Sequence, residues 1–264
     1  MRPWALALLL GGCAPGAAPP PETPAMLVRA IDHIPVAVAD LERAEASFAA
    51  LGFTLKPGRA HANGIRNAHA KFADGSSIEL ITAPAAVDAL TSQYRALIAH
   101  GNGPAFLALH VPDMAALGRA LAPFGARVER EGGMVSFRAG DSLGHLFFGT
   151  GERSRTDRPE HFVHANGTQG IAAVWLAPSD RAETERLFAQ LGIRFADAWR
   201  CLEICSTARV ARIGSGELVL VDAARQRLKG RPIIGVTLRV DRGTKSRLVS
   251  PERANGIWLA FKEG

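Results

Sequence analysis

Apolar runs that end at an aspartate recur four times along the chain, over residues 30–40, 103–113, 170–180 and 232–241. After the first three, apolar residues recur at helical spacing over residues 41–51, 114–124 and 181–191. An aspartate at such a junction is typical of a helix N-cap, and a glycine follows each helical pattern: Gly52, Gly125 and Gly192. The pattern therefore predicts a strand and then a capped helix in each of these segments.

Short strand-like runs follow each of these glycines. In the first segment they cover residues 53–56, 67–72 and 77–82, and Asp74-Gly75 predicts a tight turn before the last run. The second and third segments repeat this order, whereas in the fourth residues 242–249 are too short and too basic for a helix. The repeating unit is βαβββ. We therefore predict an α+β fold of four such modules, paired over residues 28–150 and 165–264, with a helical connector at residues 85–100.

Six short motifs keep a fixed order along the chain: Ile31-Asp32-His33-Ile34, Leu51-Gly52-Phe53, Gly64-Ile65-Arg66-Asn67-Ala68, Gly75-Ser76-Ser77-Ile78-Glu79-Leu80, His164-Ala165-Asn166-Gly167 and Asn255-Gly256-Ile257-Trp258-Leu259. Together they resemble the vicinal oxygen chelate (VOC) superfamily, and more closely its two-domain glyoxalase-like members. The resemblance implies that tandem βαβββ modules form two curled mixed β-sheet cups. It also implies a divalent metal, Zn, Ni, Mn or Fe, held by His and Glu side chains from the first and last strands of the modules.

The modules differ in how many of the implied ligands they keep. The first has His33 and Glu79, whereas the corresponding positions hold Phe106, Ala173 and Ile234, and Phe148, Leu220 and Ala260. His110 lies on the same face of its expected strand as Phe106 and is either a third ligand or a hydrogen-bonded core histidine. We predict His33, Glu79 and His110 as metal ligands, with Glu79 also catalytic. Because an unpaired carboxylate is costly to bury, Glu79 should pair with His33, directly or through the metal.

Other side chains are candidates for substrate contacts. Asn67 and His69 alternate onto one face of their strand, which we expect to be the cup interior, and Arg66 then faces the other way. Phe106 and Phe148 would add aromatic surface to the same cup. The remaining polar candidates are His61 and Asn63, which either face the cup or lie in a solvated loop, and His164 and Asn166, which we expect to set a turn.

The positive charge of the chain is confined to one segment. The 264 residues carry a formal net charge of +6, and residues 225–253 hold nine basic side chains against two acidic ones, a net +7. The rest of the chain therefore sums to −1. No nucleic-acid recognition motif accompanies this segment, so we predict no nucleic-acid partner. Anionic lipid headgroups are the preferred neighbours, and a solvated, degenerate fourth module is the alternative.

Residues 1–26 predict an export signal and a tether. Arg2 and a short apolar stretch precede Leu10-Gly11-Gly12-Cys13, which resembles a bacterial lipobox with Cys13 as the lipidated residue. Five prolines follow before Met26, as in an extended spacer. We predict a lipid-anchored protein of the bacterial cell envelope that faces the periplasm. The alternative is a cytoplasmic protein whose translation starts at Met26.

Cys201 and Cys205 lie four residues apart in a strand-like run. On one strand their Cα atoms would be about 13 Å apart, beyond the roughly 7 Å that a disulfide tolerates. We therefore predict two small buried apolar residues and no disulfide.

Two functions agree with these patterns, together with a third, purely structural, role. The first is a metal-assisted lyase, isomerase or dioxygenase that acts on a small oxygenated molecule. The second is a metal-free lipoprotein that binds or sequesters a small aromatic molecule in the Phe106 and Phe148 cup. Four modules in one chain allow a monomer, and a homodimer is the alternative.

Overall fold

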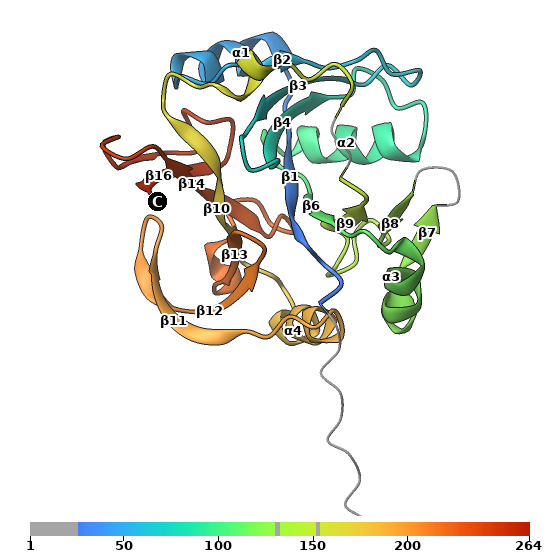
Figure 1. Ribbon diagram of the computed structural model, residues 1–264. Helices are drawn as coiled ribbons and strands as arrows, with labels where there is room; N and C mark the ends of the chain where they lie inside the picture. The colour runs from blue at the N-terminus through green and yellow to red at the C-terminus, as the bar shows by residue number, and fades with distance from the viewer. Residues whose placement is uncertain (1–25, 130–132, 152–153) are drawn as a thin grey trace, which may run out of the picture.

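The computed structural model describes residues 26–129, 133–151 and 154–264, and these residues form two mixed β-sheets (Figure 1). The first sheet has the strand order β2-β3-β4-β1-β6-β9-β8-β7, with β5 paired to β1. Its strands are β1 (Ala30–Ala37), β2 (Lys56–Pro57), β3 (Arg66–Lys71), β4 (Ser77–Thr82), β5 (Gly103–Pro104), β6 (Leu107–His110), β7 (Arg127–Glu129), β8 (Met134–Ser136) and β9 (Leu146–Gly149).

The second sheet has the order β11-β12-β13-β10-β14-β16-β15. Its strands are β10 (Thr168–Leu176), β11 (Ala196–Cys201), β12 (Cys205–Ile213), β13 (Gly216–Leu220), β14 (Ile233–Val240), β15 (Arg247–Val249) and β16 (Trp258–Glu263). The α+β architecture is the one that the repeat predicted, and the two curled mixed sheets are those that the resemblance implied.

Each sheet is made of two modules joined at their first strands. In every module the first strand pairs in parallel with the last: β1 with β4, β6 with β9, β10 with β13 and β14 with β16. The first strands of the two modules then pair antiparallel, β1 with β6 and β10 with β14. Figure 1 shows β1 running through the middle of the molecule, so side chains on β1 lie at the joint of the first cup.

The predicted N-caps are confirmed. Asp40, Asp113 and Asp180 each accept a hydrogen bond from the backbone N–H three residues later, at 2.8–2.9 Å. They begin the helices α1 (Leu41–Ala50), α3 (Met114–Leu121) and α4 (Arg181–Gln190), and the predicted connector is α2 (Ala89–Ala99). Three short 3-10 helices complete the set: η1 (Ala122–Phe124), η2 (Pro159–Phe162) and η3 (Ala223–Arg225). The fourth module has no α-helix within residues 233–263, all of which are described.

The two halves share one hydrophobic core. The largest buried cluster contains residues of both sheets, and the rings of Phe53 and Phe261 lie 5.9 Å apart across the boundary. Ile31 of the first half also packs against Gly216 of the second. The approach is so close that a Cβ at Gly216 would lie 2.8 Å from the Ile31 side chain. The halves are therefore packed together through the helix-bearing faces of their sheets, which leaves the opposite faces as the two cups.

Most arginines of the basic segment, residues 225–253, contact other parts of the protein. Buried Arg231 donates to the Pro104 carbonyl at 3.0 Å, Arg239 forms an ion pair with Asp74 at 2.9 Å, and Arg247 donates to the Leu51 carbonyl at 2.9 Å. These three contacts all tie the second half to the first. Arg225 and Arg227 pair with Glu203 and Glu252 within the second half. Headgroup binding therefore stays a prediction for the exposed basic side chains alone.

The prediction that Cys201 and Cys205 form no disulfide is wrong. The chain reverses between β11 and β12, so the two cysteines are a cross-strand pair with Cα atoms 4.0 Å apart, and they form a disulfide. Cys205 is exposed rather than buried. The sequence argument assumed one continuous strand, and the turn at residues 202–204 removes that assumption.

We expect the double variant Cys201→Ser/Cys205→Ser to unfold at a free energy about 2 kcal/mol lower, the magnitude that a loop this short gives in the chain-entropy model. Urea unfolding measures it. A reductant should lower the stability of the native protein by the same amount and leave the double variant unchanged. A reductant effect that persists in the double variant would contradict this assignment.

The predictions about the membrane concern mainly residues outside the described part. The lipobox, Cys13 and the proline-rich spacer lie within residues 1–25, so lipid anchoring stays a prediction. Among the described helices, none combines the length and the apolar character needed to cross a bilayer. The start at Met26 stays the alternative.

Candidate functional site in the first cup

Four polar side chains lie together on the cup face of the first sheet: His33 on β1, Glu79 on β4, and Asn67 and His69 on β3. In the β3–β4 register His69 lies opposite Glu79 and Asn67 lies opposite Ile81. Ala70, the residue after His69, belongs to the main core on the other face. The predicted alternation of Asn67 and His69 onto the cup interior is therefore confirmed, and Arg66 faces away, where it pairs with Glu42.

Glu79 is the centre of this cluster and is only 7% exposed. The Nδ2 atom of Asn67 donates to its Oε1 at 2.5 Å, and the Nε2 atom of His33 lies 3.5 Å from its Oε2. The Nε2 atom of His69 lies 4.0 Å from Oε1. The expectation that a buried Glu79 pairs with His33 is confirmed, and both carboxylate oxygens have partners.

Asp32 is a member of the cluster that the sequence did not reveal. The β1–β6 register shifts between Ile31 and His33, which is a β-bulge that inserts Asp32. The Oδ1 atom of Asp32 lies 3.4 Å from Nδ1 of His33. His33 therefore has a carboxylate at each ring nitrogen, an arrangement that strict strand alternation does not predict.

The two histidines have pKa values shifted in opposite directions. Burial lowers the pKa of His33, but the hydrogen bond with Asp32 and the negative charge of Glu79 outweigh it, so the pKa is raised above 6.5. For His69 burial dominates and lowers the pKa, although the charge of Glu79 partly offsets it. At a pH between the two pKa values the cup therefore holds a protonated His33 beside a neutral His69. Each side chain keeps about a quarter of its surface exposed, 23% and 25%, so both remain within reach of a ligand.

Aromatic rings form the apolar part of the cup. The ring of Phe147 lies 5.4 Å from that of His33, Phe106 lies 6.1 Å from Phe147, and Tyr94 of α2 lies 5.5 Å from Phe106. Burial, together with the charge of Glu79, raises the pKa of the Tyr94 hydroxyl well above 10. Phe106 therefore belongs to this cup, as predicted. The position of Tyr94, the only tyrosine in the chain, on the buried side of the connector helix was the signal that sequence reasoning missed.

The placement of Phe148 in the cup is wrong. Phe148 is fully buried in the main core and contacts Phe137, while its neighbour Phe147 faces the cup. The prediction counted a fixed number of residues from the preceding glycine, and this count is one residue off in the second module. A shift of one residue moves a side chain to the opposite face of a strand.

The predicted ligand set His33, Glu79 and His110 is not assembled. His110 lies at the end of β6 opposite Ala30, where its charge acts on Asp32 and its ring packs against Gly151. In residues 26–129, 133–151 and 154–264 no group of three or more His, Cys, Asp or Glu side chains is arranged to hold a metal ion. Because His110 does not reach Glu79, the predicted set does not fit the implied divalent metal, and the chemistry proposed below uses side chains alone.

Buried Lys56 and half-buried Lys71 mark one end of the cup. Lys56 lies opposite His69 in the β2–β3 register and Lys71 follows His69 on the same face of β3. Both contact Asp157, at 2.6 and 2.7 Å. Asp157 comes from the segment between the two sheets, which passes close to β3 near η2. This contact of two lysines with one aspartate therefore joins the segment to the β2–β3 end of the cup.

The remaining sequence candidates have structural contacts. Asn63 donates to Asp88, the N-cap of α2, and His61 is not part of the polar cluster. The Nδ1 atom of His164 accepts from the Thr54 backbone N–H at 3.0 Å, and its Nε2 hydrogen-bonds to the Lys71 carbonyl at 2.8 Å. Asn166 donates to the Leu51 carbonyl. His164 and Asn166 were expected to set a turn, and a turn lies there, closed by the hydrogen bond from the Gly167 N–H to the His164 carbonyl at 2.9 Å.

The cup of the second sheet is apolar. Ala173, Ile234 and Ala260, three of the positions equivalent to metal ligands, lie in one buried cluster with Trp175. Leu220 faces the main core instead. The polar chemistry described above is thus a property of the first cup.

Comparisons with known proteins agree with this architecture. A protein of Staphylococcus aureus described as hypothetical has a similar structure, with 16% identity, a TM-score of 0.65, and coverage of 89% of this chain and 98% of that one. A mutant of 4-hydroxymandelate synthase from Streptomyces coelicolor gives 16% identity, a TM-score of 0.57, and 89% and 92% coverage. A fusion protein described as xylose isomerase-like TIM barrel/4-hydroxyphenylpyruvate dioxygenase gives 21% identity and a TM-score of 0.56, and the match covers 84% of this chain and 38% of that one. At these identities the likeness shows the fold alone.

The family is identified by comparison of the sequence. No curated protein matches it. A family model described as a glyoxalase-like domain matches residues 31–192, more than half of the 264 residues. The chain therefore belongs to the glyoxalase-like domain family of the VOC superfamily.

Proposed function

We propose that the first cup binds a small oxygenated or aromatic molecule and moves a proton on it, with His33 as the acid and His69 as the base. The observation that carries this proposal is the pair of histidines whose pKa values are shifted apart around one carboxylate. Two titratable groups in such contrasting environments divide naturally into an acid and a base. Members of the superfamily often use divalent metals, but the proposal needs only side chains of this chain.

The geometry suggests how the reaction proceeds. Neutral His69 removes a proton from the carbon next to a carbonyl. Protonated His33 keeps Nδ1 on Asp32 and gives the carbonyl oxygen the proton of Nε2, which lies 3.5 Å from Glu79, and an enol forms. Return of the His69 proton to the same carbon, while His33 takes back the O–H proton, reverses the step. In an enediol, delivery of the His69 proton to the other carbon gives an isomer, and His33 again takes back an O–H proton. Glu79 is a positioning residue here, because Asn67 holds its Oε1 and its charge favours the protonated form of His33. Phe147 and Phe106 offer an apolar surface to the rest of the molecule.

Proton exchange on phenylpyruvate tests this function, since the molecule carries adjacent oxygens, an exchangeable C3–H and a ring. We expect the protein to accelerate deuterium uptake at C3, measured by proton NMR in D₂O, beyond the rate in buffer. The variant His100→Gln, at an exposed histidine outside the cup, should keep this acceleration. Exchange at the buffer rate would overturn the proposed proton transfer.

Binding without catalysis is the second candidate function, favoured by the enclosed Tyr94, Phe106 and Phe147 rings. Benzoate, which has no exchangeable C–H, tests it separately. If benzoate shifts the His33 and His69 resonances while phenylpyruvate shows no accelerated exchange, the cup is a binding site alone.

A further inference from the structure

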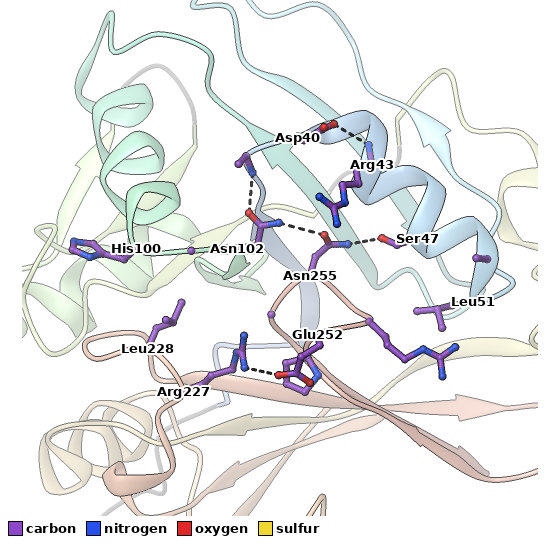
Figure 2. Close-up of a pocket in the computed structure, with 16 residues that line it drawn as sticks. Asp40, Arg43, Ser47, Leu51, His100, Asn102, Arg227, Leu228, Glu252 and Asn255 are labelled. Carbon is purple, nitrogen blue, oxygen red and sulfur yellow. Dashed lines mark hydrogen bonds and ion pairs between the residues drawn. The ribbon is translucent and has the colours of Figure 1, made fainter.

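A cavity of about 630 Å³ lies between the two halves and is lined by none of the residues of the polar cluster in the first cup (Figure 2). Its walls come from three separate parts of the chain: α1 with the two residues before it, residues 100–102 after α2, and residues 227–228 and 251–256 of the second half. Its volume falls within the roughly 300–1,000 Å³ of small-molecule sites. Neither the family nor the chemistry of the cup accounts for this space.

One wall of the cavity is built by a chain of hydrogen bonds. The backbone N–H of Ala39 donates to Oδ1 of Asn102 at 2.9 Å, Nδ2 of Asn102 donates to Oδ1 of Asn255 at 3.4 Å, and Nδ2 of Asn255 donates to Oγ of Ser47 at 2.8 Å. Figure 2 shows this chain linking α1 to the second half. The wall therefore joins both halves through side-chain amides.

The Asn255-Gly256 turn fixes this wall. Asn255 has a φ of 53°, a left-handed conformation that asparagine tolerates better than most residues. Gly256 has a φ of 89°, and a Cβ there would meet the carbonyl oxygen of Asn102 at 2.0 Å. The Asn255-Gly256 motif of the sequence thus has a structural reason, which is the close approach of the two halves at this cavity.

Donors outnumber free acceptors in the cavity. Within the described part of the chain neither Arg43 nor Arg253 has a carboxylate at ion-pair distance, and in Figure 2 the Arg43 guanidinium points toward Asn102 and Asn255. Each asparagine Nδ2 carries two N–H groups and uses one in the chain above. The two carboxylates of the lining are engaged, since Asp40 caps α1 and Glu252 pairs with Arg227 at 2.7 Å.

We propose that this cavity binds a small molecule through an oxyanion, a carboxylate or a phosphate, held by Arg43 and Arg253 with Asn102 and Asn255 as neutral donors. Guanidinium groups suit this role because their planar fork donates two hydrogen bonds to one carboxylate or phosphate. Leu51 and Leu228 supply apolar surface for the rest of the molecule. Because the walls come from both halves, a bound anion stabilises their packing and raises the unfolding temperature. The site is independent of the proton transfer proposed for the cup.

Thermal unfolding of the purified protein, titrated separately with inorganic phosphate and with citrate at constant pH and ionic strength, tests the proposal. We expect a saturable rise in the unfolding midpoint with at least one anion, and the more effective anion identifies the source of the oxyanion. Arg43→Gln and Arg253→Gln should each weaken the apparent affinity at least tenfold. Both side chains are exposed at the cavity, so the variants should unfold at the native midpoint without anion.

Arg212→Gln is the matched control, because Arg212 is exposed on β12 and does not line the cavity. It should respond to the anions as the native protein does. Three results would overturn the proposal: no saturable rise with either anion, an undiminished rise in both cavity variants, or the same loss in Arg212→Gln.

Discussion

Replacing Arg231 with methionine is expected to lower the free energy of unfolding by about 3–5 kcal/mol, the range for removal of one partner from a buried charged contact. Arg231 is 6% exposed and donates to four backbone carbonyls of the first half, those of Leu97, Gly101, Gly103 and Pro104. Burial lowers its pKa to about 10, so it stays charged at neutral pH. Its loss leaves several carbonyls at the interface of the halves without a donor.

Urea unfolding measures this effect, and Arg227→Met is the control. Arg227 belongs to the same basic segment but forms an exposed ion pair with Glu252, which contributes at most about 1 kcal/mol. Arg231→Lys should lie between the two, because one ammonium cannot reach all four carbonyls. Similar losses for Arg231→Met and Arg227→Met would show that Arg231 does not hold the halves together.

The sequence predicted those features that depend on local patterns. The capping aspartates, the glycines after the helices and the alternation of Asn67 and His69 involve residues within a few positions of each other, and the structure confirms them. The pairing of His33 with Glu79 also followed, since a buried carboxylate needs a partner. The module architecture and every member of the polar cluster except Asp32 could be predicted in this way.

The errors share a physical cause, which is an irregularity in a strand. The turn at residues 202–204 brings Cys201 to Cys205, a one-residue offset exchanges Phe147 for Phe148, and the bulge in β1 adds Asp32 to the cup. Each depends on how two strands pair, and a regular repeat of two residues does not contain that information. Contacts between distant segments, such as Asp157 with Lys56, were not predicted because no local pattern relates residues 101 positions apart.

The two halves of the protein share one architecture but differ in the side chains that line their cups. The first cup keeps ionisable groups around Glu79, while the second is filled by Trp175 and aliphatic residues. Through the shared core and the Arg231 contacts, the second half packs against the first and stabilises it. The polar cavity between them adds a place where a small anion could act on this packing, as proposed above.

The proton-exchange activity of the first cup should depend on pH as a bell-shaped curve. The base, His69, must be neutral, so activity rises as the pH rises through its pKa, which lies below 6.5. The acid, His33, must be protonated, so activity falls as the pH rises through its pKa, which lies above 6.5. Both forms coexist between the two values. Removal of either histidine should lower the rate by about 10²–10⁴-fold, the usual contribution of an acid or base.

Variants of the two carboxylates separate this mechanism from a merely structural role. Asp32 raises the pKa of His33 and is not among the groups that act on His69, so Asp32→Asn should move only the alkaline limb to lower pH. Glu79 raises the pKa of both histidines, so Glu79→Gln should move both limbs to lower pH. Phenylpyruvate exchange across the pH range, with histidine pKa values from NMR, measures these shifts. Limbs that stay in place in both variants, or that move together in Asp32→Asn, would contradict the assignment of acid and base.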